Sequence, residues 1–560
     1  MIFLKLCTKF FDCTCKLQLG ERNLEAPMSG VRLTSYLITA ICFLFLSCQK
    51  TAKHHTFQNI VVVLADDHAL KVTGAYNNDL IRTPNMDRLA GEGLTFTRAY
   101  CNAPICSASR ASLLTGKYPH ATGVNLLFTP FPDEGNTTIG EHLQEQGYQT
   151  ALFGKTHFNN WMWSSLYKDG LPKHGFDTLV QRGEYQSWLK AQNVPSPPDS
   201  LEYYDREAAR GIIPEWMNAR CLPHPIHDAQ SEGTFYANQA VEFIRQNQNN
   251  PFFVWLAFKE PHHPYYFPME YADKYDPATI TLPEGSPEDD RWIPEKFRGL
   301  TDDEKRGIIS AYYTSTEYMD KNLGLVLDAL EELELEEETI VLYISDNGYL
   351  LYEHKRFEKH TMWEEAIRQP LIIRPGKSFR PGEKEGALVE YIDVMPTLLD
   401  LIGVKGIDET QGKSFRDVLQ GNASEHKEIA FSEYLEDNLA MVCNKKWKYV
   451  FTTGRRDLGI GYQTGYGPSG IVHRLYDLEN DPGESKSVAK LPELADTLQL
   501  MQEEMLEVFM ETHPESDQCP EGLTLEGKLV WFCEPRDVGA DQSLRDFPWR
   551  VFHDNKNLKQ

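Results

Sequence analysis

Four apolar runs in the amino-acid sequence end in side chains that could do chemistry. The runs are residues 60–64, 150–153, 252–258 and 340–344. The polar groups that follow them are Asp66-Asp67, Lys155-Thr156-His157, His262-His263 and Asp346-Asn347. Because ligands bind to open parallel sheets beyond the carboxyl ends of the strands, we expect these four groups to face one crevice.

Two of these groups supply the hard oxygen donors that Ca²⁺ and Mg²⁺ prefer, whereas zinc favours histidine and cysteine. The donors are Asp66, Asp67, Asp346 and Asn347. Each group alone has another interpretation, since paired aspartates are common in turns and helix caps, and Asp-Asn-Gly forms tight turns. Their position at the ends of two predicted strands favours a metal site.

A cysteine and an arginine are placed for anion chemistry in the segment Cys106-Ser107-Ala108-Ser109-Arg110. Residues 107–114 are predicted to form a short helix that stops at Gly116. Cys106 then lies at a helix N-terminus, where free N–H groups and the macrodipole favour an anion. Arg110 follows one turn later, near enough to hold that anion. The alternative for Cys106 is a buried thiol on a core helix.

Residues 106–123, CSASRASLLTGKYPHATG, resemble the signature of the sulfatase family. The first five residues are a weak signal alone, but the continuation SLLTGKYP follows the longer family pattern. Ala108 stands where proline is most common, and alanine is an accepted variant. The resemblance extends over residues 59–509 and implies the alkaline phosphatase-like fold.

The resemblance also implies how residue 106 and a metal would work together. Cys106 would be oxidised after synthesis to formylglycine (3-oxoalanine) by a dedicated maturase. One Ca²⁺ ion would be held by Asp66, Asp67, Asp346, Asn347 and the modified residue 106. One hydroxyl of the hydrated aldehyde would attack sulfur, and the second would be deprotonated as sulfate departs.

Further roles follow from the same resemblance. The implied substrate-binding side chains are Arg110, Lys155, His262 and Lys359, and fixed cations among them would stabilise charge on the sulfate oxygens. Lys359 begins the segment KHTMWE, which is similar to the family's Lys-x-Thr-x-Tyr/Phe-Glu. His157 would interact with the diol of residue 106, and His262 would protonate the leaving oxygen. His263 stays an alternative for that second role.

The helices and strands that position these residues are predicted to form an α/β domain at residues 59–405. Apolar runs alternate there with amphipathic helices, which predicts a large, mainly parallel sheet flanked by helices. Residues 199–230 show no clear period and are predicted to be an insertion at the rim. Residues 425–512 carry shorter, alternating strands and resemble the smaller C-terminal α+β domain of sulfatases, with its antiparallel sheet. Residues 513–560 are assigned to a C-terminal tail without a predicted element.

The sequence of the N-terminal segment predicts that the protein is exported. Residues 28–48 resemble a signal peptide with a lipobox-like end, so that Cys48 would be lipidated and residues 49–58 would form a tether. Residues 1–27 would be an upstream extension from a misassigned start. The alternative is an uncleaved signal anchor. We expect a periplasmic or cell-surface protein that meets a bacterial membrane only through this lipid anchor.

Charge and composition restrict the class of substrate that the protein could bind. The formal net charge is −26, with 82 acidic and 56 basic residues, which argues against a nucleic-acid partner. The rim insertion, the predicted anchor and the aromatic side chains near the site favour a sulfated carbohydrate, such as a glycosaminoglycan or an algal glycan. These aromatic side chains could stack on sugar faces or simply belong to the core; they are Trp161, Trp163, Tyr265, Tyr266 and Phe267.

Two rival functions stay open. One is hydrolysis of phosphate or phosphonate esters by a member of the same superfamily. The other is a non-catalytic, glycan-binding surface lipoprotein in which Cys106 is unmodified. The sequence also leaves open whether Cys519 and Cys533 form a disulfide.

Overall fold

The central strand of the fold, β1 (Asn59–Asp66), is buried along its whole length in a computed structural model of the chain. The structure describes residues 58–127, 129–132, 134–158, 172–376, 379–453 and 470–534. The predicted signal peptide, Cys48, Trp161 and Trp163 lie outside these residues. Within them, every helix is too short or too polar to cross a membrane.

The sequence of β1 explains its central place. Ile60, Val62 and Leu64 pack into the core on one face of the sheet, and the side chains between them pack on the other. A strand that is apolar on both faces needs cover on both sides. Within the sheet, β1 lies between two parallel neighbours, β5 (Phe252–Pro261) and β6 (Thr339–Ser345).

The main sheet has nine strands among the described residues, in the order β10-β2-β9-β6-β1-β5-β3-β4, with β11 paired to β2. The remaining strands of this sheet are β2 (Leu94–Tyr100), β3 (Gln149–Gly154), β4 (Thr178–Val180), β9 (Arg368–Pro375), β10 (Glu383–Glu385) and β11 (Val389–Glu390). Only β9, among the described strands of this sheet, runs antiparallel to its neighbours, β2 and β6. The predicted mainly parallel sheet is therefore confirmed.

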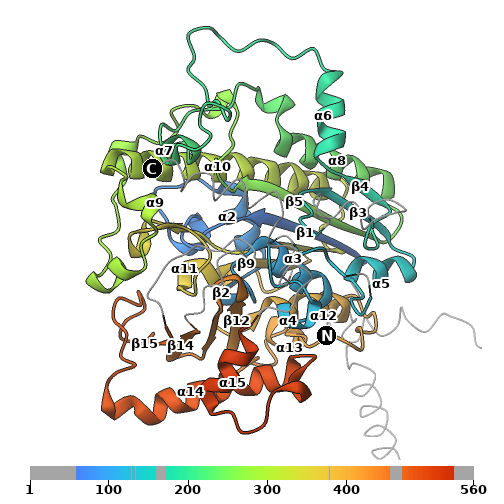
Figure 1. Ribbon diagram of the computed structural model, residues 1–560. Coiled ribbons are helices and arrows are strands. Elements are labelled where there is room, and N and C mark those ends of the chain that lie inside the picture. The colour runs from blue at the N-terminus through green and yellow to red at the C-terminus, as the bar shows by residue number, and fades with distance from the viewer. Residues whose placement is uncertain are drawn as a thin grey trace, which may run out of the picture. The chain divides into compact units, whose positions relative to one another are not determined.

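Helices cover both faces of this sheet (Figure 1). On one face pack α2 (Pro84–Glu92), α8 (Glu232–Asn247) and α10 (Asp302–Glu332). On the other pack α3 (Cys106–Thr115), α5 (Ile139–Glu145) and α12 (Val394–Leu401). The other described α-helices before residue 425 are α4 (Pro119–Thr122), α6 (Arg182–Lys190), α7 (Ile213–Trp216), α9 (Glu295–Arg298), α11 (Glu364–Ile367) and α13 (Arg416–Leu419). The layered α/β prediction is thus confirmed.

A second, antiparallel sheet lies in the C-terminal region, as predicted. Its strands are β12 (Ala430–Tyr434), β13 (Leu439–Cys443), β14 (Trp447–Thr452) and β15 (Val472–Asp477), paired in chain order. Leu439, Met441 and Cys443 of β13 face the core of the main domain. Ala440 and Val442 face α14 (Ala495–Thr512) instead. Strand periodicity therefore places this sheet between the main domain and its own helix.

Among the described residues, one α-helix lies beyond residue 512, where the sequence analysis assigned no element. α15 (Leu525–Phe532) packs on α14, and its Leu529 and Phe532 are buried (Figure 1, orange and red). Cys519 and Cys533, whose pairing the sequence left open, are both free thiols.

Candidate active site

The ends of β1 and β6 bring the predicted oxygen donors together. The two strands pair in parallel up to Ala65 and Ser345, so the residues after them share one edge of the sheet. Asp67 takes a left-handed backbone, with φ of 66°, and its N–H donates to Asp346 Oδ1 at 3.1 Å. Asn347 donates from Nδ2 to Asp67 Oδ1 at 2.7 Å. Asp66, Asp67, Asp346 and Asn347 are all fully buried.

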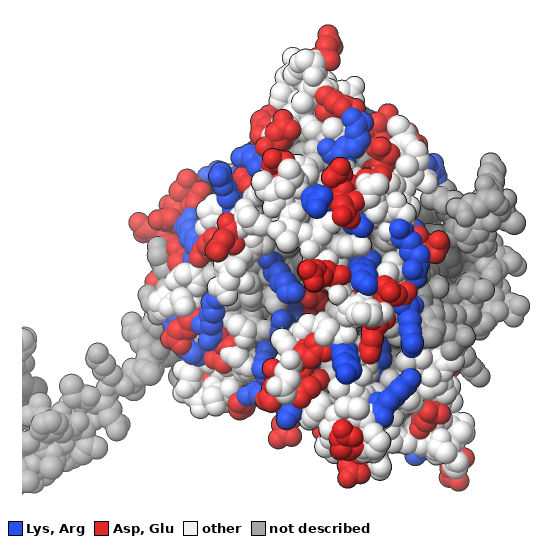
Figure 2. Space-filling model, turned by 90° about the vertical axis from the view of Figure 1, so that its left-hand side faces the viewer, with Lys and Arg blue, Asp and Glu red and all other residues white. Residues whose placement is uncertain are grey.

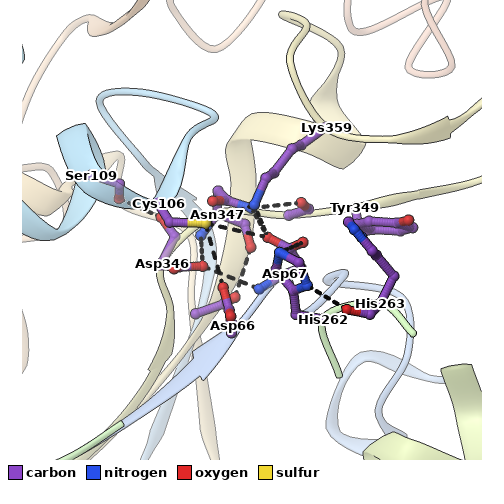
Figure 3. A network of polar contacts seen from close by, with 12 residues as sticks. Asp66, Asp67, Cys106, Ser109, His262, His263, Asp346, Asn347, Tyr349 and Lys359 are labelled. Carbon is purple, nitrogen blue, oxygen red and sulfur yellow. Dashed lines mark hydrogen bonds and ion pairs between the residues drawn. The ribbon is translucent and has the colours of Figure 1, made fainter. Parts of the chain in front are cut away.

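Cys106 is the first residue of α3, as predicted, and Gly116 ends that helix with φ of 66°. The Cys106 Sγ lies 3.4 Å from Asp66 Oδ1 and 2.7 Å from Lys359 Nζ (Figure 3). Burial and the nearby Asp346 raise the pKa of the Cys106 thiol well above its ordinary value. An unmodified Cys106 is therefore a neutral thiol and a weak nucleophile here.

Arg110 joins this helix to both strand ends. Its Nε donates to Asp346 Oδ2 at 2.8 Å, and its Nη1 donates to the Lys155 carbonyl at 2.6 Å. The Arg110 side chain is 1% exposed, and its Nη2 has no hydrogen-bond partner. One buried donor of the guanidinium therefore stays available at the site.

Two lysines complete the group of cations. Lys155 Nζ lies 2.5 Å from Asp66 Oδ2, and Lys359 Nζ forms an ion pair with Asp67 Oδ1. Burial raises the pKa of the Asp66 carboxyl, but Lys155, Arg110 and Lys359 together hold it well below its usual range. The Asp66 carboxyl is therefore ionised at neutral pH.

The donor set fits a divalent cation of the calcium type. Asp67 Oδ2 and Asn347 Oδ1 are buried oxygens without a hydrogen-bond partner, which is costly unless something else contacts them. Burial, together with Asp66 and Asp346, raises the pKa of Asp67 to about 7 even though the Lys359 ammonium lies beside it, so a further positive charge would stabilise this carboxylate. Ligand atoms of Asp66, Asp67, Cys106 and His262 lie within 4.8 Å of one another.

The charges of this site point to an anionic ligand. Among its described residues, three buried carboxylates face three cations: Asp66, Asp67 and Asp346 against Arg110, Lys155 and Lys359. A divalent cation would leave the group with two net positive charges. That excess has the sign that an anionic ester group requires.

The structure gives different surroundings to the two adjacent histidines, His262 and His263, between which the sequence could not choose. His262 Nε2 lies 3.7 Å from Asp67 Oδ2, and its Nδ1 contacts the His263 carbonyl at 2.7 Å (Figure 3). Burial lowers the pKa of both imidazoles, that of His263 to about 4. Of the two, His262 has the direct contact with the group of carboxylates.

His157 lies at the end of β3, within the electrostatic influence of Lys155, Arg110 and Lys359. Burial and these cations lower the pKa of His157 well below its ordinary value, so the ring is neutral. Its Nδ1 is buried without a hydrogen-bond partner. The structure thus places His157 beside the site with one nitrogen free.

Some supporting residues were not found by sequence reasoning. The Ser109 hydroxyl donates to the Asp346 carbonyl, the Tyr312 hydroxyl donates to the Asp67 carbonyl, and Arg356 Nη2 donates to the Lys359 carbonyl at 3.1 Å. Ser109 lay inside the recognised segment. Tyr312, in the middle of α10, had no local signal, because only the packing of α10 brings it to β1.

Comparison with protein-family models agrees with this geometry. The sulfatase model matches residues 58–404, and the model of the C-terminal region of N-sulphoglucosamine sulphohydrolase matches residues 352–511. A sulfatase of Formosa agariphila is 28% identical over 477 residues, covering 80% of this chain and 87% of that protein. The N-acetylglucosamine-6-O-sulfatase of Bacteroides thetaiotaomicron is 28% identical over 443 residues, covering 70% and 76%.

A solved structure supports the fold. The phosphonate monoester hydrolase of Silicibacter pomeroyi aligns with a TM-score of 0.67 at 23% identity, covering 82% of this chain and 97% of that one. At this identity the likeness concerns the fold alone. The sulfatase model, in contrast, spans more than half of the sequence and both strands that end in the buried aspartates. The chain therefore belongs to the sulfatase family of sulfuric ester hydrolases.

Proposed function

We propose that this protein hydrolyses sulfate esters of a carbohydrate at the site around Cys106. The observation that carries the proposal is the buried group of three carboxylates and three cations at the N-terminus of α3. Relatives such as the N-acetylglucosamine-6-O-sulfatase support the carbohydrate, since they share most of the chain.

Arg110, Lys155 and Lys359 would bind the sulfate group and stabilise the negative charge that spreads over its oxygens. Lys359 is suited to this role because its ammonium group already contacts the Cys106 sulfur at 2.7 Å. His262 is the better candidate to protonate the leaving oxygen, because it contacts Asp67 while His263 turns toward Trp216.

Asp66, Asp67, Asp346 and Asn347 would hold one Ca²⁺ ion, which would supply positive charge next to residue 106 when bound. The unpartnered oxygens of Asp67 and Asn347 support this assignment. Cys106 would be converted to formylglycine by a maturase, since the thiol itself is a weak nucleophile with a raised pKa. The neutral His157, with its free Nδ1, would accept a proton from the modified residue 106.

We further propose that the protein is exported and lipid-anchored through Cys48. This proposal rests on the sequence of residues 28–48, which end in Phe-Leu-Ser-Cys. Radiolabelled palmitate incorporated into the wild-type protein but not into Cys48→Ala would support it, and equal labelling of both would refute it.

The test of the activity is sulfate release from a panel of sulfated oligosaccharides. The protein should be produced together with a formylglycine-generating enzyme, and Cys106→Ala serves as the blank. We expect release from at least one sugar, and a mass of the residue 106 peptide that matches formylglycine. An active preparation with only unmodified thiol would refute the mechanism.

The second candidate function is hydrolysis of phosphonate monoesters, because one structural neighbour of high fold similarity has this activity. The same panel should therefore contain a phosphonate monoester and a phosphate ester. Cleavage of these esters without sulfate release would favour the second function. If none of the sulfate, phosphonate and phosphate esters is cleaved but the protein still binds glycans, the non-catalytic lipoprotein would be favoured.

A further inference from the structure

A second cluster of cationic and aromatic side chains lies next to the candidate active site, on its rim. The chain of contacts begins at His262, whose ring centroid lies 4.2 Å from that of His263. The ring of Trp216 follows, 6.1 Å from His263. The rim cluster consists of Arg206, Trp216, His224, Lys259 and Tyr266. It combines residues from the rim insertion with the end of β5 and the loop after it.

Tyr266 is the centre of the rim cluster. The Lys259 ammonium lies 4.1 Å from the centroid of the Tyr266 ring, and Arg206 Nη1 lies 3.4 Å from its hydroxyl. The His224 ring packs on the same tyrosine with 3.8 Å between centroids. The Arg206 guanidinium also lies 5.5 Å above the centre of Trp216. Two cations are thereby held against two aromatic rings.

The aromatic residues 265–267, for which the sequence left sugar stacking and core packing both open, divide in the structure. Tyr265 and Phe267 are buried in the core, and the Tyr265 hydroxyl contacts that of Tyr349 at 2.9 Å. Tyr266, between them, stays partly exposed. Its backbone carbonyl accepts a hydrogen bond from Ser315 at 2.8 Å, so the ring is presented from a fixed backbone. Tyr266 and Trp216 are thus both partly exposed at the rim.

Two polar groups of the rim cluster lack partners in the described part of the chain. The Lys259 ammonium forms no hydrogen bond or ion pair there, although the residue is half-buried. Both ring nitrogens of His224 are buried without a hydrogen-bond partner. Burial lowers the pKa of Lys259 to about 8, which shows that nearby carboxylates do not fully compensate its charge. An anion at this place would compensate it.

The local charge balance is positive. The charged side chains that act on Lys259 are Glu232, Arg182, Arg206 and Glu260. Burial and the neighbouring Glu232 raise the pKa of Glu260 to about 7, so this carboxyl is partly protonated at neutral pH. Figure 2 looks onto the side of the molecule where α7, α9 and α11 lie in Figure 1, and basic and acidic side chains alternate there. The rim cluster therefore carries a local excess of positive charge on a surface of mixed charge.

We propose that the rim cluster is a second substrate subsite, which binds an additional anionic group of the carbohydrate. The group would be a second sulfate or a uronic acid carboxylate, on the sugar that carries the scissile sulfate or on its neighbour. Arg206 and Lys259 would contact the anion, and Trp216 and Tyr266 would hold these two cations in place. The proposal rests on the sulfatase function proposed above.

The test compares three substrates with the same scissile sulfate. They are N-acetylglucosamine-6-sulfate, glucosamine-2-N,6-O-disulfate, and a disaccharide of a uronic acid and N-acetylglucosamine-6-sulfate. The measured quantity is the ratio of kcat/KM for each doubly charged sugar to kcat/KM for the singly sulfated sugar. We expect Lys259→Met and Arg206→Gln each to lower this ratio about tenfold, as for a lost charge-assisted hydrogen bond.

Two controls accompany these variants. Lys259→Arg keeps the charge and should retain most of the preference. Arg210→Gln removes a cation of the same insertion that pairs with Glu207 at 4.0 Å, outside the rim cluster, and should leave the ratio unchanged. A preference for the disulfate alone, or for the uronic acid alone, would identify which anion the subsite accepts.

The proposal is overturned if Lys259→Met and Arg206→Gln leave the ratio unchanged, or if Arg210→Gln lowers it equally. Calorimetry with Cys106→Ala and the same three sugars separates this result from a failure of the proposed activity. If no sugar releases sulfate, tighter binding of a doubly charged sugar that depends on Lys259 still supports the subsite. Equal binding of all three sugars refutes it.

Discussion

Lys448 of β14 is fully buried and lies 3.1 Å from Glu364, the first residue of α11. The same ammonium lies 2.8 Å from Glu484, and Glu484 in turn accepts from the backbone N–H of Glu364 at 2.7 Å. Lys448 thereby links the C-terminal sheet to the segment that carries Lys359. A buried ion pair therefore fixes the C-terminal sheet to the segment next to the candidate active site.

Lys448→Met should destabilise the protein by about 3–5 kcal/mol, because two buried glutamates would lose their shared cation. Chemical denaturation of the wild type and the variant measures this change. The matched control is Lys446→Met, since Lys446 is exposed and its Nζ lies 3.7 Å from Glu479. Adding Glu484→Gln to Lys448→Met should recover part of the loss. Equal stability of the two single variants would contradict this account.

Lys359→Ala should lower kcat by about 10²–10³, because a buried cation would be missing where the sulfate charge develops. Circular dichroism should show an intact fold. Lys355→Ala is the control, because Lys355 lies nearby in the chain and pairs with Asp290 at 2.7 Å on the surface. A turnover of Lys359→Ala near the wild-type rate would remove this lysine from the catalytic group.

Removal of calcium with a chelator should lower the thermal midpoint, and added Ca²⁺ should restore it. At a concentration one hundred times its Kd, the ion would stabilise the fold by about 2.7 kcal/mol. Asp67→Asn should abolish most of this response, while Asp79→Asn, an exposed residue, should keep it. A calcium-dependent shift of equal size in both variants would place the ion elsewhere.

Stability should fall at alkaline pH through His354. Burial lowers the pKa of this imidazole, but its hydrogen bonds to Asp289 and Glu365 raise it from 6.5 to about 9. Because the folded-state value is the higher one, the stabilisation is complete below about pH 6.5 and is lost as the pH rises through 9.

The comparison of wild type with His354→Gln isolates this contribution. The difference in unfolding free energy should reach roughly 3 kcal/mol at pH 6 and shrink toward pH 10. His142→Gln serves as control, because that imidazole contacts only the Lys405 carbonyl at an exposed place. A difference that stays constant from pH 6 to 10 would show that His354 acts through packing on Trp363 alone.

Local rules were sufficient for many elements. The apolar run of β1 gave a strand buried on both faces, and Gly116 ended α3. The position of Cys106 at a helix N-terminus was likewise predicted from nearby residues. These features depend on periodicity and on a single conformational preference, which a short segment carries by itself.

Long-range pairing could not be read from the sequence in the same way. The antiparallel direction of β9 depends on its neighbours β2 and β6, and α15 becomes visible only through its packing on α14. Tyr312 supports Asp67 from 245 residues away, without any local pattern. Such contacts depend on how whole elements pack.

The sequence by itself determined the family and the class of fold, and it predicted which side chains carry the chemistry, because the motif and the strand ends are local. Only the tertiary structure decided that His262, and not His263, contacts Asp67, and that Arg110 reaches Asp346. It also showed Lys259 without a partner among the described residues, beside Tyr266. The physical reason is that pKa values, ion pairs and unsatisfied groups arise from burial among residues distant in the chain.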